Sequence, residues 1–227
     1  YVLKTSSNMT TEALTAYLPL NRASLRRAVG QAGEQAGDLC GGSPRTDLRP
    51  VSNWPPRPTF RSMSRRYRIL DPAGLYFVSF ATVGWVDLFT RRSYKDIVVD
   101  SLRYCQAEKG LLLFEWVIMS SHVHLMIKAG GATDLSGILR DLKKYTSRQL
   151  IRGIQEHPQE SRREWLLKMF REAGERNSNN STYQVWQQHN KPLLLERTEE
   201  VERVADYIRQ NPVMEGIVAN AVDYLYS

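Results

Sequence analysis

The hydrophobic pattern between residues 75 and 131 predicts three strands and one helix. Runs rich in aromatic and β-branched residues favour strands, whereas apolar side chains that recur near every 3.6 residues favour a helix. Gly110 ends the predicted helix, and Ser120 and Ser121 separate the last two strands, which we expect to pair as a hairpin. The predicted elements are a strand at 75–83, a helix at 92–109, and strands at 111–121 and 122–131.

A longer helix is predicted at 135–154, with Asp134 as a favourable N-cap residue. Its apolar stripe should face the core and ends in Tyr145, which we expect to be a core aromatic residue. The apolar stripe consists of Leu135, Ile138, Leu139, Leu142 and Tyr145. A basic stripe at four-residue spacing on a neighbouring face consists of Arg140, Lys144, Arg148 and Arg152.

The C-terminal part of the chain has a less regular pattern. Residues 156–181 are polar, charged and finally rich in Asn and Ser, which predicts an insertion or a mobile loop. Short strand-like runs follow at 181–186 and 191–196. The last helix is predicted at 198–210, because acidic residues stand in its first turn and Pro212 follows it.

Residues 1–62 differ from the rest of the chain, because Gly and Pro interrupt them and apolar periodicity is weak. They predict a disordered leader, and the working protein is expected to start at Met63. The remaining part suits one domain, since 42% of the chain is hydrophobic. Cys40 and Cys105 lie far apart, so neither a disulfide framework nor a Cys-ligated zinc site is supported.

The net charge of the chain is +7 and its pI is about 9.5, which makes nucleic acid a partner to consider. More than half of this excess lies in the first 62 residues, which carry +4. A nucleic-acid interpretation therefore depends on where the basic residues stand along the chain. No apolar run approaches the roughly 20 residues of a membrane span, so a soluble, cytoplasmic protein is expected.

His122 and His124 stand two residues apart in a predicted strand, so both imidazoles should point to one face. Their Cα atoms would lie roughly 6 to 7 Å apart, close enough for the rings to share one cation. The apolar side chains between and after them would point the other way, into a core. Such a pair is more often an ordinary surface or core pair, and a metal site would need a third ligand.

Tyr207 and Asn211 stand one helical turn apart in the last helix, beside its apolar stripe rather than within it. A phenol and a carboxamide on this flank can both enter a cleft. A phenol is a weak nucleophile at neutral pH, so it needs a nearby cation, and phosphoryl transfer is a reaction that combines these groups. Taken alone, Tyr207 would be interpreted as a partly buried packing residue.

The segment HVH (122–124), followed after a long helix by DYIRQNPVMEGIV (206–218), resembles the single-tyrosine HUH transposases. The resemblance is closest to the REP-associated tyrosine transposases, and HUH denotes His, bulky hydrophobe, His. It extends through WVIMSSHVHLMIK (116–128) and WQQHNKPLLLE (186–196) and covers about residues 63–227. The HUH triplet alone is weakly specific, but its combination with Tyr-x-x-x-Asn-Pro-Val at this separation is specific.

This resemblance implies a ferredoxin-like α+β palm, an antiparallel sheet with helices on one face and the metal site on the other. It implies that His122, His124 and Asn211 bind Mg²⁺ or Mn²⁺ and that Tyr207 is the nucleophile. The implied activity is cleavage and rejoining of single-stranded, hairpin-forming DNA through a 5′-phosphotyrosine link, without an external energy source. Such relatives act as monomers or as homodimers that exchange the tyrosine helix, and the sequence leaves both open.

The basic stripe on the 135–154 helix would then contact DNA phosphates, although without the resemblance a solvated helix face is the better interpretation. A basic arm before the first strand consists of Arg65, Arg66 and Arg68. Trp116, Trp186 and His189 are candidates for stacking on unpaired bases, but core packing is the simpler expectation for both tryptophans.

Two other functions stay open at this point. One is a hairpin DNA- or RNA-binding protein that does not cleave, for which the His, Tyr and Asn residues are not needed. The other is an HxH-type phosphoesterase that hydrolyses its substrate through water, without a phosphotyrosine intermediate.

Overall fold

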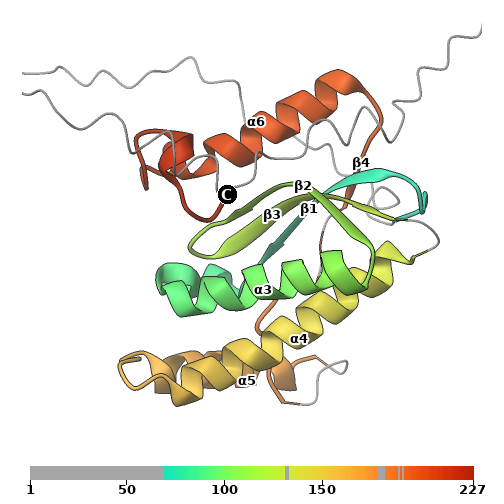
Figure 1. Cartoon of the computed structure of the whole chain (residues 1–227). Helices are drawn as coiled ribbons and strands as arrows, with labels where there is room; N and C mark the ends of the chain where they lie inside the picture. Colours follow the sequence, from blue (N-terminus) through green and yellow to red (C-terminus); the bar gives the residue numbers. More distant parts are fainter. Residues whose placement is uncertain (1–68, 131–132, 178–181, 189, 191) are drawn as a thin grey trace, which may run out of the picture. The chain divides into compact units, whose positions relative to one another are not determined.

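The computed structural model describes residues 69–130, 133–177, 182–188, 190 and 192–227, which form a four-stranded sheet packed with helices (Figure 1). The strands are β1 Leu75–Ala81, β2 Leu111–Ile118, β3 His122–Ala129 and β4 Leu193–Leu195. The helices are α3 Arg92–Glu108, α4 Leu135–Glu156, α5 Arg163–Glu175 and α6 Thr198–Met214. Short 3₁₀ segments are η2 Val83–Trp85, η3 Leu88–Thr90 and η4 Ala221–Asp223. The predicted leader, Arg65, Arg66, Arg68 and His189 lie outside the described residues.

The sheet is antiparallel, and its strand order β2-β3-β1-β4 is that of a ferredoxin-like βαββαβ fold. β1 pairs with β3 on one side and with β4 on the other. The predicted hairpin of β2 and β3 turns at Ser120 and Ser121, where the Met119 N–H donates to the carbonyl of His122 over 2.8 Å. The predicted fold class is confirmed.

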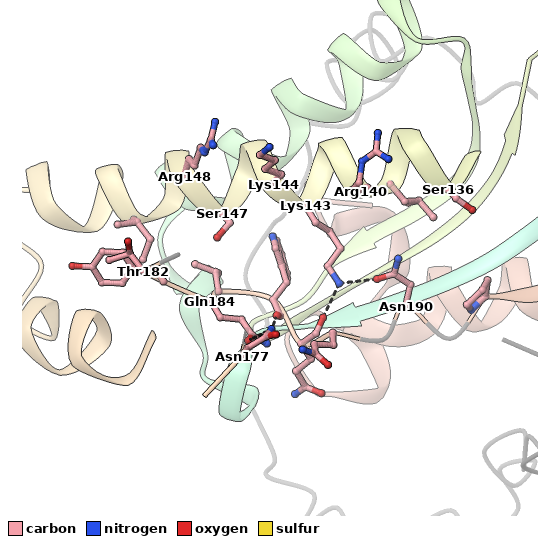
Figure 2. A pocket seen from close by; sticks show the side chains of 18 of the residues that line it. Ser136, Arg140, Lys143, Lys144, Ser147, Arg148, Asn177, Thr182, Gln184 and Asn190 are labelled. Atoms are coloured by element: carbon pink, nitrogen blue, oxygen red, sulfur yellow. Dashed lines mark hydrogen bonds between the residues drawn. The ribbon is translucent and has the colours of Figure 1, made fainter. Parts of the chain in front are cut away.

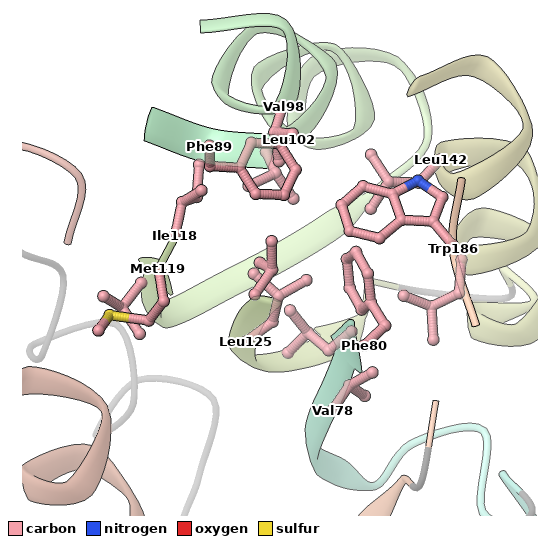
Figure 3. Packing of buried hydrophobic residues seen from close by; sticks show 14 of the residues in the cluster. Val78, Phe80, Phe89, Val98, Leu102, Ile118, Met119, Leu125, Leu142 and Trp186 are labelled. Atoms are coloured by element: carbon pink, nitrogen blue, oxygen red, sulfur yellow. The ribbon is translucent and has the colours of Figure 1, made fainter. Parts of the chain in front are cut away.

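The alternating side chains of β1 and β3 give the sheet two unlike faces. The register pairs Val78 with Leu125 and Ser79 with His124, and directly paired residues share a face. Val78 and Leu125 belong to the apolar core on the side of α3 and α4, whereas His124 faces Tyr207 of α6, on the opposite side (Figures 1 and 3). Helices α3 and α4 therefore cover one face and the two histidines lie on the other, as expected, but α6 covers the histidine face as well.

The core between the sheet and helices α3 and α4 is built around Trp186 (Figure 3). This side chain stacks on Phe89 with ring centroids 5.5 Å apart and meets Phe80 edge-on at 4.8 Å. Its indole N–H donates to Thr146 Oγ1 over 2.9 Å, so the polar atom of this large buried ring is satisfied. Core packing is confirmed for Trp186, and Trp116 is partly buried against the same core.

The expectation that Tyr145 is a core residue is wrong, because Tyr145 is 56% exposed and Thr146 is buried in its place. The buried stripe of α4 continues from Leu142 to Thr146 and Leu150 at four-residue spacing. Thr146 can be buried because its hydroxyl donates to the Leu142 carbonyl over 2.7 Å and accepts the indole N–H of Trp186. Thr146, and not Tyr145, therefore continues the buried face that Leu142 and Leu150 define.

The interpretation of 156–181 as a mobile loop is wrong for the part that forms α5, whereas its interpretation as an insertion stays a prediction. The buried face of α5 has a narrow stripe at four-residue spacing, Leu166, Phe170 and Gly174. The turn before α5 is fixed by the buried carboxylate of Glu160. Arg91 Nε and the Tyr94 hydroxyl donate to its Oε2 over 2.8 and 3.0 Å, and the Arg162 N–H donates to its Oε1 over 3.1 Å.

Helix α6 begins at Thr198, as predicted, but it continues through Pro212 to Met214. The fixed φ of proline fits a helix, and in the last turn its missing N–H costs a single hydrogen bond. Within the described ranges, no helix is both long and apolar enough to cross a bilayer.

Candidate active site

His122 and His124 lie on the face of β3 that is covered by α6, as their spacing predicts. Their ring centroids are 4.7 Å apart, and the residues are only 8% and 5% exposed. Nδ1 of His122 lies 3.2 Å from the hydroxyl of Ser121, in the turn that precedes the strand. The pair therefore places two largely buried imidazoles side by side on one face of the sheet.

Helix α6 brings Tyr207 and Asn211 to the histidines. The Tyr207 hydroxyl lies 3.5 Å from Nε2 of His124, at the outer limit of a hydrogen bond, and the ring centroids are 5.3 Å apart. Asn211 is buried, donates from Nδ2 to the Tyr207 carbonyl over 3.1 Å, and forms a side-chain hydrogen bond with His122. The structure therefore brings together the four side chains that the sequence indicated as one site.

Contacts from several elements fix α6 over this face. Its buried stripe includes Val204, Ala205 and Ile208. Arg209 forms an ion pair with Glu115 of β2. Phe77 of β1 packs against both rings of the site, with centroids 5.4 Å from His124 and 6.1 Å from Tyr207. These contacts set the position of the Tyr207 hydroxyl relative to His124.

Burial, and after it the charge of the neighbouring His122, lower the pKa of His124 to about 3. Burial also lowers the pKa of His122, although the Glu215 carboxylate and the hydrogen bond with Asn211 raise it. Both rings are therefore neutral at physiological pH and keep a lone pair available. A base as weak as His124 does not take a proton from Tyr207, so this contact orients the hydroxyl.

The histidine pair and Asn211 form a donor set that suits a divalent cation. Nδ1 of His124 is buried and has no hydrogen-bond partner in the described part of the chain, which is a costly state for a polar atom. Neutral imidazoles and an amide oxygen are ligands that divalent cations accept. No three His, Cys, Asp or Glu side chains gather as a metal-binding cluster among the described residues, so the third protein ligand here would be Asn211.

Two residues beside this site, Glu215 and Trp85, were not expected from the sequence. Glu215 follows α6 one turn after Asn211, near enough to raise the pKa of His122. The four-residue spacing of Tyr207, Asn211 and Glu215 was a usable signal of a shared helix flank. Trp85 lies in η2 with its ring centroid 5.6 Å from that of His122, and a short turn has no periodicity that could indicate this.

The basic stripe of α4 borders a groove of about 1300 Å³ (Figure 2). The α4 side of the groove includes all four predicted residues, Arg140, Lys144, Arg148 and Arg152. The opposite wall includes Tyr183, Gln184, Gln187 and Asn190. The lining residues do not include either histidine, Tyr207 or Asn211, so the groove and the candidate active site are separate surfaces.

Lys143 bridges the two walls of this groove, as Figure 2 shows. Its Nζ donates to the Gln187 carbonyl over 2.6 Å and to Asn190 Oδ1 over 2.7 Å, and burial lowers its pKa to about 8. Arg140 pairs with Asp141 and Arg152 with Glu156. Lys144 and Arg148 form no ion pair within the described ranges, so their charges are the most available to a ligand.

The fold and the site can be compared with known proteins. A family described as "Transposase IS200 like" matches residues 86–171, from the turn after β1 into α5. This segment, less than half of the chain, is therefore similar to the IS200-like transposases. The matched segment includes His122 and His124 and ends before the helix that carries Tyr207.

Two solved structures are similar to this chain. One is described as a REP-associated tyrosine transposase bound to a REP hairpin; it is 19% identical, with a TM-score of 0.50 over 73% of this chain and 81% of that chain. The other is described as a candidate transposase from Deinococcus radiodurans R1; it is 17% identical, with a TM-score of 0.38 over 63% of this chain and 94% of that chain. At 19% identity the first likeness shows a shared fold. No curated protein matches the chain.

Proposed function

We propose that this protein cleaves and rejoins single-stranded, hairpin-forming DNA, with Tyr207 as the nucleophile and Mg²⁺ or Mn²⁺ held by His122, His124 and Asn211. The observation that supports it best is the Tyr207 hydroxyl 3.5 Å from Nε2 of His124. The IS200-like match and the shared fold with a transposase bound to a REP hairpin favour a DNA hairpin as the substrate.

In this reaction, the Tyr207 oxygen attacks the scissile phosphorus and the bond to the 3′ oxygen breaks. The phenol proton leaves to solvent, the 3′ oxygen takes up a proton, and the 5′ phosphate stays esterified to Tyr207. A free 3′-OH later attacks the same phosphorus and releases Tyr207, so the bond is conserved and no energy source is consumed. A tyrosine that is oriented before the substrate binds lowers the entropic cost of this attack.

The residues around Tyr207 prepare it for the attack. A bound divalent cation would polarise the scissile phosphate and offset the charge that builds on its oxygens. The neutral histidines keep their lone pairs for such an ion, and Asn211 contacts both His122 and the Tyr207 backbone. A shift of α6 would therefore change the nucleophile and the ligand set together.

The groove beside α4 is the proposed contact surface for the rest of the DNA. Arg148 and Lys144 would neutralise phosphates at its rim, which is the sequence-independent part of DNA binding. Tyr183 and the amides of Gln184 and Gln187 on the opposite wall are chemically suited to unpaired bases.

The proposal is tested by incubating the full chain with labelled hairpin single strands and Mn²⁺, followed by a denaturing gel. The wild type should form a covalent protein–DNA adduct, which Tyr207→Phe should lose while it still binds DNA. Tyr145→Phe, at an exposed tyrosine of α4, is the matched control and should keep the adduct. His124→Ala should lose the stimulation by Mn²⁺.

Other outcomes of this assay favour other functions. Cleavage without an adduct indicates hydrolysis by water, as in a phosphoesterase. Binding without cleavage indicates a hairpin-binding protein on the same palm. An adduct with Tyr207→Phe would overturn the nucleophile assignment.

A further inference from the structure

Trp85 is a large aromatic residue that stays exposed beside the candidate active site. It is 58% exposed, and its ring centroid lies 5.6 Å from that of His122. The two ring planes are inclined at 67°, so the indole is not stacked on the imidazole. A flat apolar surface is thus open to solvent next to a predicted metal ligand.

The backbone holds Trp85 in an unusual conformation. Its φ is 55°, and no other non-glycine residue in the described ranges has a positive φ. Bulky side chains rarely adopt this left-handed region, and such residues persist where the surrounding structure enforces them, often at functional sites. The preceding Gly84 has a φ of 65°, which only glycine adopts readily.

A buried threonine ties the turn of Trp85 to the turn that precedes the histidine strand. The Trp85 N–H donates to the Thr82 carbonyl over 3.0 Å. The Thr82 hydroxyl lies 2.7 Å from the Val86 carbonyl and 3.0 Å from the Ser121 carbonyl, and the Thr82 N–H donates to Ser121 as well. Because Ser121 precedes His122 directly, the backbone of Trp85 keeps a fixed position relative to the site.

We propose that Trp85 is a stacking platform for one unpaired base of the DNA strand, at a nucleotide next to the bond that is cut. This inference rests on the proposed function, since it requires single-stranded DNA at the histidine pair. Every base has an aromatic face, so a rigid indole at this place would hold the strand in register without a preference for one base. The platform orients the substrate, and it takes no part in bond breaking.

Binding of a hairpin with an unpaired flank, measured without metal, is the first test. Trp85→Asn removes the ring and suits a left-handed backbone, and we expect its Kd to rise about 5- to 100-fold, as for loss of one base–aromatic stack. Trp85→Phe should restore much of the affinity. Trp165→Ala, at a tryptophan of α5 that is 53% exposed, is the matched control and should bind like the wild type. Melting temperatures of all variants confirm that each is folded.

A scan of single abasic sites along the DNA is the second test. In the wild type, one abasic position next to the cleaved bond should weaken binding about as much as Trp85→Asn does. In Trp85→Asn, the same abasic position should have no further effect, because the stacking partner is already absent. If every abasic site weakens binding by the same factor in the wild type and in Trp85→Asn, Trp85 is not a stacking platform.

The outcomes separate this inference from the proposed function. If the wild type binds and cleaves but Trp85→Asn matches it, the platform is wrong and the proposed function stands. If the wild type neither binds nor cleaves single strands, both are wrong. If Trp85→Asn weakens only Mn²⁺-stimulated cleavage and leaves binding unchanged, Trp85 supports His122 instead of a base.

Discussion

Glu160 and His124 are both buried polar residues, but they lie in opposite surroundings. Glu160 lies in the turn before α5, away from the candidate active site. Its two carboxylate oxygens accept hydrogen bonds from Arg91, Tyr94 and Arg162. His124 lies on the other side of the sheet, and one of its ring nitrogens has no partner in the described part of the chain. The hydrogen bonds of Glu160 stabilise the fold, whereas the unsatisfied nitrogen of His124 needs another explanation, for which we propose a bound ligand.

The largest effect on stability should come from truncation on the core side. Phe80→Ala removes a ring that packs against Trp186 and should lower the free energy of unfolding by about 3 to 5 kcal/mol. Urea denaturation of the wild type and the variant measures this difference. A loss below about 1 kcal/mol would mean that this part of the core is loosely packed.

The second-largest effect on stability should come from acidification, which protonates Glu160. Burial raises the pKa of this carboxyl, but the hydrogen bonds from Arg91, the Arg162 backbone and Tyr94 outweigh it and bring the pKa to about 2, below the usual 4.5. Ionised Glu160 therefore stabilises the fold fully above pH 4.5, and this contribution of about 3 kcal/mol is lost as the pH falls toward 2.

The comparison of wild type with Glu160→Gln isolates this contribution. Free energies of unfolding measured between pH 2 and 6 should fall more steeply with acid in the wild type than in the variant. If the free energies of unfolding of the two proteins fall in parallel with pH, other groups cause the acid sensitivity.

On the histidine face of the sheet, replacement of a buried polar ring should not lower the free energy of unfolding. His124→Leu should keep the free energy of unfolding within about 1 kcal/mol of the wild type or raise it, because a poorly satisfied polar group is replaced by an apolar one. The same variant should lose metal-dependent cleavage. Thermal unfolding checks the first part, and a stability loss above about 2 kcal/mol would give His124 a structural role.

The smallest effect on stability is expected at the rim of the groove. Arg148→Ala should change the free energy of unfolding by less than about 0.5 kcal/mol, since the side chain is exposed. It should weaken DNA binding and lower the slope of log K against log salt by about 0.7 to 0.9, as for loss of one phosphate contact. Arg103→Ala, at an exposed arginine of α3, is the control and should leave that slope unchanged. An unchanged slope for Arg148→Ala would favour a solvated helix face.

Local patterns were sufficient to predict much of the fold. The period of two placed His122 and His124 on one face, and the N-cap at Asp134 started α4 where expected, with its carboxylate accepting from Ser136 and Gly137 N–H groups. The meeting of β3 with α6 joins residues 83 positions apart. No local pattern contains that contact, and the resemblance to a known family supplied it.

The failures have physical causes at particular residues. Tyr145 and Thr146 both fit the edge of the α4 stripe, and Thr146 faces the core, where its hydroxyl accepts the indole N–H of Trp186. Helix α5 has a usable amphipathic pattern, with Leu166 and Phe170 at four-residue spacing, and it was missed because polar and charged residues flank it on both sides. Trp85 stands in a turn whose geometry depends on hydrogen bonds through Thr82, which sequence spacing does not encode.

The contact between Tyr207 and His124 lies within one polypeptide, and this has a consequence for mixtures of chains. If both groups act in the same chain, each folded molecule is a complete catalytic unit, and turnover per molecule is independent of protein concentration. An equimolar mixture of Tyr207→Phe and His124→Ala chains then stays inactive, because no active site contains both an intact Tyr207 and an intact His124. In proteins that exchange the tyrosine helix between subunits, the same mixture recovers activity.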